Sequence, residues 1–156
     1  MNNQTKAQEF EKRAIIALRK IEQDWARLFF AKAIATDPAS VSPKSYNEYG
    51  ALLAEQKKYA EALKIFQKGL ELCGSEQKMW KAAFYDNIVE TLSILGRYDE
   101  ARMLAAQAIE FNTAYLAELD SRPMTNTEDL VRGCIEFSIA EMKRFLNDSE
   151  PPSPAP

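Results

Sequence analysis

Residues 58–74 read KYAEALKIFQKGLELCG. In a helix, Ala62, Phe66 and Gly69 of this stretch fall on one face, because they stand four and then three residues apart. That face carries a bulky side chain between two small ones, so a second helix can approach closely on both sides of the ring. The same spacing of positions recurs at Ala26, Phe30 and Ala33, and again at Ala101, Ala105 and Ala108.

The three copies begin 36 and then 39 positions apart. Self-similarity at about 34 residues is typical of a helical repeat array. The internal prolines Pro38, Pro43 and Pro123 all fall where a helix predicted by the apolar periodicity should stop or start. We therefore expect an all-α fold, a right-handed α-solenoid of three helix-turn-helix repeats with a seventh, capping helix. The predicted helices cover about 3–20, 23–36, 43–56, 60–72, 76–95, 99–118 and 126–146.

Several helix starts have recognisable capping residues. Ser42 before Pro43 is typical of an N-cap followed by a first-turn proline, and Ser75 is placed to cap the fifth helix. Thr125 and Glu128 have the spacing of a capping box before the seventh helix. Since the last repeat of a solenoid exposes an apolar face, we expect this helix to cover it. Its apolar side would comprise Leu130, Val131, Cys134, Ile135, Phe137, Ile139 and Met142.

The chain resembles the tetratricopeptide repeat, whose pattern is W-x2-L-G-x2-Y on a first helix and A-x3-F-x2-A on a second. The middle copy carries the resemblance best, and the first copy departs from it where Arg13 stands at a normally apolar position. The resemblance implies repeats at about 7–40, 43–76 and 82–115 within a domain of residues 3–147. The Pro/Ser-rich composition of residues 148–156 predicts a disordered tail. The matching residues of the middle copy are Tyr46, Tyr49, Gly50, Leu53, Tyr59, Ala62, Phe66 and Gly69.

The composition argues against catalysis. The 156 residues include no histidine, which removes the usual neutral-pH base and the commonest metal ligand. The cysteines, Cys73 and Cys134, stand far apart without Cys or His neighbours. Gly69, Gly74 and Gly96 lie at helix ends, and no glycine-rich phosphate-binding loop is present. We therefore expect no catalytic residues, no cofactor and no metal, and a chain that is not an enzyme.

Charge and hydropathy narrow the choice of partner. Between residues 75 and 156, fourteen acidic residues stand against eight basic ones, within a net charge of −3 for the whole chain. Nucleic acid needs a concentrated basic face, so it is disfavoured as a partner. No apolar run approaches the roughly 18–20 residues that cross a membrane, and the polar start of the chain lacks the apolar core of a signal peptide. We expect no membrane insertion and a cytoplasmic location.

The resemblance also implies where a ligand would lie. In tetratricopeptide arrays the first helices of the repeats line the concave side, where an extended or helical peptide is held. Asn47 and Asn87 can both donate to and accept from a peptide backbone, and Asp86 with Glu90 should favour a neutral or basic ligand. The implied groove residues are Glu11, Ile15, Arg19, Lys44, Asn47, Glu48, Ala51, Glu55, Ala83, Asp86, Asn87, Glu90 and Ile94.

Some members of the family clamp the acidic C-terminal tails of heat-shock chaperones with Lys, Asn and Arg side chains. Binding of such tails is not expected here, because this chain lacks the basic clamp at the matching places. The main hypothesis is a non-catalytic scaffold that binds a protein or peptide, and a homodimer is left open. Two alternatives stand beside it: a chaperone similar to the type III secretion translocator chaperones, and a structural subunit of a larger complex. The residues at the clamp positions are Glu11, Ile15, Glu48, Ala83 and Asn87.

Overall fold

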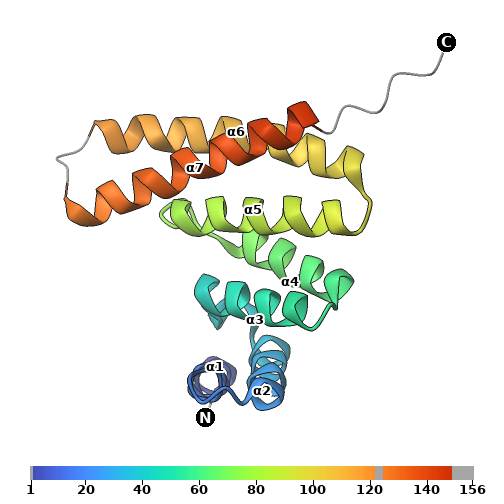
Figure 1. The fold of residues 1–156 in the computed structure, drawn as a ribbon. Coiled ribbons are helices and arrows are strands. Elements are labelled where there is room, and N and C mark those ends of the chain that lie inside the picture. Colours follow the sequence, from blue (N-terminus) through green and yellow to red (C-terminus); the bar gives the residue numbers. More distant parts are fainter. Residues whose placement is uncertain (1, 122–124, 149–156) are drawn as a thin grey trace. The chain divides into compact units, whose positions relative to one another are not determined.

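The computed structural model describes residues 2–121 and 125–148, and over these residues the chain is helical with no strand. The helices form two compact units, which divide between Gly74 and Ser75. The expected all-α class is confirmed; the linker proline Pro123 and tail residues 149–156 lie outside the described residues. The elements are α1 (Asn3–Arg19), α2 (Gln23–Thr36), the short 3-10 turn η1 (Pro38–Ser40), α3 (Pro43–Glu55), α4 (Tyr59–Leu72), α5 (Lys78–Ile94), α6 (Tyr98–Asp120) and α7 (Asn126–Asp148) (Figure 1).

The first unit consists of α1 to α4, with α1 packed on α2, α3 on α4, and α2 on α3. The repeated small and bulky positions form its core as the spacing predicts. Ala26, Phe30 and Ala33 are fully buried on α2, and Phe66 is 2% exposed on α4. Gly50 of α3 lies directly against the Phe66 ring, so the two helices of this hairpin meet at a residue without a side chain.

The turn inside each helix pair has the same backbone geometry. Ile21, Lys57 and Gly96 all adopt the left-handed conformation, with φ of 62°, 60° and 72°. In each turn the next residue donates its N–H back to the carbonyl five residues before it, as in the Glu22 to Ala17 bond of 2.9 Å. This Schellman closure caps the first helix of each pair. Since only one of the three positions is glycine, the turn is imposed by the packing of the pair more than by local preference.

The segment between α2 and α3 is fixed by three interactions. Ser42 accepts from the Ser45 N–H at 3.3 Å, which confirms it as the N-cap of α3. Glu11 of α1 accepts from the Ser42 N–H at 3.0 Å. The Tyr46 hydroxyl donates to the Pro38 carbonyl at 3.0 Å, and burial, together with nearby carboxylates, raises the Tyr46 pKa to about 12.

The second unit consists of α5, α6 and α7. In it α7 runs alongside α6 and also contacts α5 (Figure 1). Ile135 and Ile139 of α7 pack with Ala82 of α5 into a core that side chains from α6 extend. Thr125 and Glu128 exchange the two hydrogen bonds of the expected capping box, at 2.9 and 3.3 Å. Within this unit α7 therefore covers the α5–α6 pair, as expected of the capping helix.

Several expectations about single residues are wrong. Helix α5 begins at Lys78, and Ser75 does not cap it, because its hydroxyl bonds to the neighbouring Glu76 side chain instead. Trp25, next to the fully buried Ala26, is 56% exposed. On α7, Leu130 and Phe137 are 70% and 67% exposed, and Cys134 is exposed as well. The buried stripe of α7 is narrower than the sequence suggests and consists of Ile135, Ser138, Ile139 and Met142.

Candidate functional site

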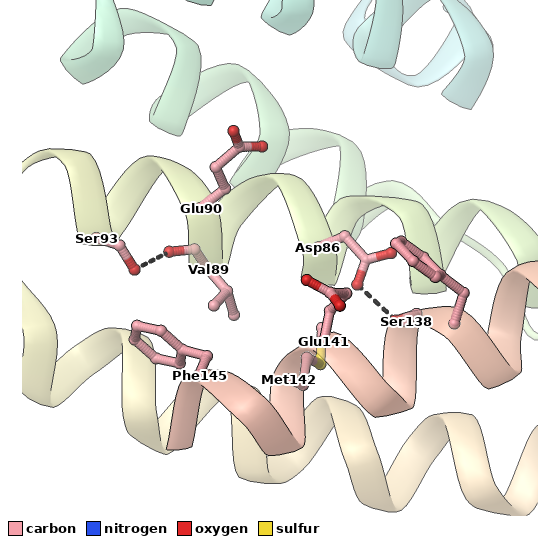
Figure 2. A pocket seen from close by; sticks show the side chains of 9 residues that line it. Asp86, Val89, Glu90, Ser93, Ser138, Glu141, Met142 and Phe145 are labelled. Atoms are coloured by element: carbon pink, nitrogen blue, oxygen red, sulfur yellow. Dashed lines mark hydrogen bonds between the residues drawn. The ribbon is translucent and has the colours of Figure 1, made fainter. Parts of the chain in front are cut away.

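A hollow of about 390 Å³ lies between α5 and α7, wholly within the second unit (Figure 2). The apolar residues Val89 and Met142 form its floor, and they are only 6% and 4% exposed. Phe137 stands in its lining and is largely open to solvent. A half-open apolar hollow of this size, lined by a few polar groups, is the usual form of a binding site in a protein. The lining residues are Asp86, Val89, Glu90, Ser93, Phe137, Ser138, Glu141, Met142 and Phe145.

Helix spacing places the polar groups of the hollow. Asp86 and Glu90 stand one turn apart on α5; in Figure 2 the Asp86 carboxylate turns toward Ser138 of α7, whereas the Glu90 carboxylate turns away from α7. Glu141 lies one turn beyond Phe137 on the facing helix α7. None of the lining residues is Lys or Arg, and Glu141 pairs with Arg144 at 2.9 Å on the α7 surface. The hollow therefore carries three carboxylates, one of which has a solvent-exposed cationic partner.

A chain of buried polar groups ties the site to all three helices of the unit. The Asn112 amide of α6 donates to the Ser138 hydroxyl at 2.9 Å, and that hydroxyl donates to the Asp86 carboxylate at 2.6 Å. Asn112 is fully buried and Ser138 is 4% exposed. Because both are withdrawn from water, the bonds fix which turn of α7 faces Asp86.

The carboxylates in the lining of the hollow disfavour the entry of a further negatively charged group. Burial raises the pKa of the Asp86 carboxyl above its ordinary value, and the neighbouring Glu90 carboxylate adds to the rise. The hydrogen bond from Ser138 opposes both effects. Two like charges four residues apart on one helix repel each other. A cation entering the hollow would relieve that repulsion.

A second hollow, of about 280 Å³, lies nearer the start of α5. Trp80 and Ala83 line it from α5, with Val131 and Ile135 opposite on α7. Asp86 lines both hollows, so they meet at this carboxylate. Of the groove residues implied for α5, the structure thus places Ala83, Asp86 and Glu90 along hollows between α5 and α7. Asn87 is half-buried and Ile94 is 50% exposed, and neither lines these hollows.

The groove residues implied for the first unit are less closely grouped. Glu48, Ala51 and Glu55 of α3 line a small hollow of about 100 Å³ that Ile21 also borders. Glu11 is engaged with Ser42 and so holds the start of α3. The remaining four are half-buried or exposed and lie outside this hollow: Ile15, Arg19, Lys44 and Asn47.

The sequence reasoning missed the α7 side of the site. Ser138, Glu141 and Met142 face α5 across the main hollow, but this helix was assigned only a covering role. One signal was available, since Ser138 interrupts the apolar stripe of Ile135 and Ile139. A polar residue at a buried helix position needs a partner.

The part of the chain that the structure describes carries neither a metal-binding cluster nor a membrane-spanning helix. There, no group of three or more His, Cys, Asp or Glu side chains is placed to hold a metal ion. Among the same residues, no helix is both long and apolar enough to span a bilayer. Among the described residues neither cysteine forms a disulfide, and Cys73 is buried whereas Cys134 is exposed.

Comparison with known proteins agrees with the helix-pair geometry. Residues 42–114 match the family model of the tetratricopeptide repeat, which covers the second and third helix pairs. The chain contains tetratricopeptide repeats. The recurring left-handed turns at Ile21, Lys57 and Gly96 are the backbone counterpart of that repeat. No curated protein matches the sequence significantly.

Solved tetratricopeptide domains have a similar fold. The TPR domain of Arabidopsis OM64 aligns with a TM-score of 0.55 at 16% identity, over 87% of this chain and 98% of that one. The N-terminal domain of stress-induced protein-1 (STI-1) from C. elegans aligns with a TM-score of 0.60 at 19% identity, over 71% and 87%. The TPR2B domain of yeast Sti1, solved in complex with pHsp70, aligns with a TM-score of 0.56 at 16% identity, over 88% and 98%. At these identities the likeness concerns the fold.

Proposed function

We propose that this tetratricopeptide-repeat protein is a non-catalytic, cytoplasmic scaffold that binds a segment of another protein. The observation that carries the proposal is the apolar hollow between α5 and α7, with the implied groove residues Asp86 and Glu90 in its lining. One of the similar solved domains, yeast TPR2B, was captured with a protein ligand. The chemistry of this hollow differs from that of an acidic-tail clamp, because carboxylates stand in its lining where such a clamp needs cations.

Cross-linking at the hollow tests the proposal. A photo-reactive residue in place of the exposed Phe137 should capture the same protein segment repeatedly from native lysate, and mass spectrometry would identify it. Met142→Glu places a charge on the buried floor and should abolish capture, provided that circular dichroism shows the helices intact. The same photo-reactive residue at Met103, which is 64% exposed on α6 and outside the hollow, is the matched control. Equal capture from both positions would refute the assignment of the site.

A second candidate function is a structural subunit that uses the first helix pair. Ile16, Ile21 and Trp25 are 44%, 85% and 56% exposed, and a mainly apolar hollow of about 320 Å³ lies beside them. Exposed apolar side chains gathered at one place ordinarily mark an interaction surface. We infer that a further chain, a second copy included, covers this face in an assembly. Trp25→Lys should then lower the mass measured by light scattering for the full chain or its complex, whereas Phe137→Ala should leave it unchanged.

A further inference from the structure

We propose that the α5–α7 hollow selects a segment in which a lysine or arginine lies next to an apolar side chain, and that α7 is one wall of this binding site as well as a cap. This inference rests on the proposed protein-binding function and names the chemistry of the partner. The apolar neighbour would pack on the floor, and the cation would lie between the carboxylates of α5 and α7. An acidic tail would be rejected.

Apolar burial supplies the first part of the selection. Val89 and Met142 form a floor that is nearly closed to water, and Phe137 offers an exposed ring at its edge. Exposed aromatic rings beside a closed floor are typical of an anchor site, where one side chain of the partner becomes buried. Such a floor binds aliphatic and aromatic side chains without regard to charge.

The carboxylates supply the second part. Asp86 and Glu90 stand one turn apart on α5, and the Glu90 charge raises the Asp86 pKa, so the two groups sense each other electrostatically. No lining residue neutralises them, and Arg144 pairs with Glu141 from outside the hollow. A guanidinium or ammonium group placed here would gain charge-assisted hydrogen bonds and remove the repulsion between the two acids. Charge complementarity thus favours a cationic partner over a neutral or acidic one.

The contribution of α7 distinguishes this site from a groove made by first helices alone. Ser138 holds Asp86 in place at 2.6 Å, and Glu141 and Met142 follow it on the next turn of α7 (Figure 2). These three residues come from the helix that covers the last pair. If α7 were only a cap, changing the half-buried Glu141 would leave ligand selection unchanged.

The test uses three fluorescein-labelled peptides that differ at one residue. Each has four leucines around a central position, which is arginine, its neutral analogue citrulline, or glutamate. Fluorescence anisotropy measures affinity for the full chain, and the methyl NMR signals of Val89 and Met142 report whether the hollow is occupied. We expect the arginine peptide to bind about tenfold tighter than the citrulline peptide, and the glutamate peptide to bind more weakly still. The preference should shrink at high salt.

Three variants assign the preference to the carboxylates. Asp86→Asn keeps the oxygen that accepts from Ser138, and Glu90→Gln and Glu141→Gln change largely solvated groups, so all three should fold. Each should reduce the arginine-to-citrulline ratio to about fivefold, because one of three carboxylates that share the tenfold effect equally is then lost. Glu110→Gln on the exposed surface of α6 makes the same charge change outside the hollow and should leave the ratio unchanged.

The outcomes separate this inference from the proposed function. If all three peptides bind equally and shift the Val89 and Met142 methyls, the hollow binds apolar segments without charge selection, which overturns the inference and leaves the proposed function standing. An unchanged ratio in Glu141→Gln overturns the role of α7. If no peptide shifts either methyl signal, the inference fails, and the cross-linking experiment at Phe137 decides the proposed function separately.

Discussion

Replacement of Gly50 by alanine tests the close contact inside the middle helix pair. A Cβ built at Gly50 would lie 2.3, 2.6 and 2.7 Å from three carbons of the Phe66 ring. Non-bonded carbons are comfortable at about 3.5–4.0 Å. Phe66 is 2% exposed, so its ring is enclosed by the core of the unit. The two helices must therefore move apart, or the ring must leave its preferred rotamer.

The size of the effect follows from two opposing contributions. Overpacking a core costs about 1–3 kcal/mol, whereas alanine in place of glycine inside a helix gains about 1 kcal/mol. With contacts this short, the cost belongs at the upper end of its range, and we expect Gly50→Ala to destabilise the first unit by about 1–2 kcal/mol. In a Phe66→Leu background the ring edge is gone. There the same substitution should stabilise the unit by up to about 1 kcal/mol, so that its sign reverses.

Urea unfolding measures both effects. The two tryptophans report separately, because Trp25 lies in the first unit and Trp80 in the second. Unfolding is therefore followed by the fluorescence of Trp25 in a Trp80→Phe background, and the four members of the Gly50 and Phe66 cycle are compared. If Gly50→Ala stabilises the protein equally in both backgrounds, only helix propensity is at work, and the contact between α3 and α4 is not as described.

Three further predictions concern the turns and the second unit. Ile21→Gly should raise the stability of the first unit by about 0.5–1 kcal/mol in the same assay. Relief of the left-handed strain, about 1–2 kcal/mol, exceeds the extra unfolded-state entropy of glycine. Gly96→Ala should lower the stability of the second unit for the same reason. Asp86→Asn should stabilise the second unit at pH 7, followed by Trp80 fluorescence. The raised pKa of Asp86 penalises the folded state above that pKa, so the advantage of the variant should fade as the pH falls toward the ordinary aspartate value; an advantage that grows on acidification would contradict this. Asn112→Ala should cost the second unit about 1–3 kcal/mol, because it removes a buried hydrogen bond to the α7 hydroxyl.

The parts of the fold that the sequence predicts are those where one side chain has a single acceptable environment. Ala26 and Phe30 stand at positions where a change in size would separate packed helices, so their spacing predicts both helix and burial. Thr125 and Glu128 satisfy each other locally, so their capping box needs no tertiary information. Trp25 is different, because periodicity gives its face of the helix but not whether another chain segment covers that face.

The geometry of the turns is a second feature that the sequence predicts only in part. Gly96 signals a left-handed residue, because glycine adopts that conformation without steric cost. Ile21 and Lys57 occupy the same position in their turns without any such signal. In these two pairs the packed helices determine the turn, and the local sequence opposes it at Ile21. Comparison between the repeats would reveal the shared position, whereas each turn taken alone would not.

The site was predictable on α5 and not on α7, and the reason lies in how α7 finds its register. A shift of α7 by one turn would bring Cys134 or Met142 opposite Asp86 in place of Ser138. Neither side chain donates as a hydroxyl does, so the partly buried Asp86 carboxylate would lose its partner. Apolar contacts alone tolerate such a shift, since small and large apolar residues recur along the α7 stripe. The polar chain from Asn112 through Ser138 to Asp86 therefore selects one register, and only that register places Met142 beneath the hollow and Glu141 near Asp86 of α5.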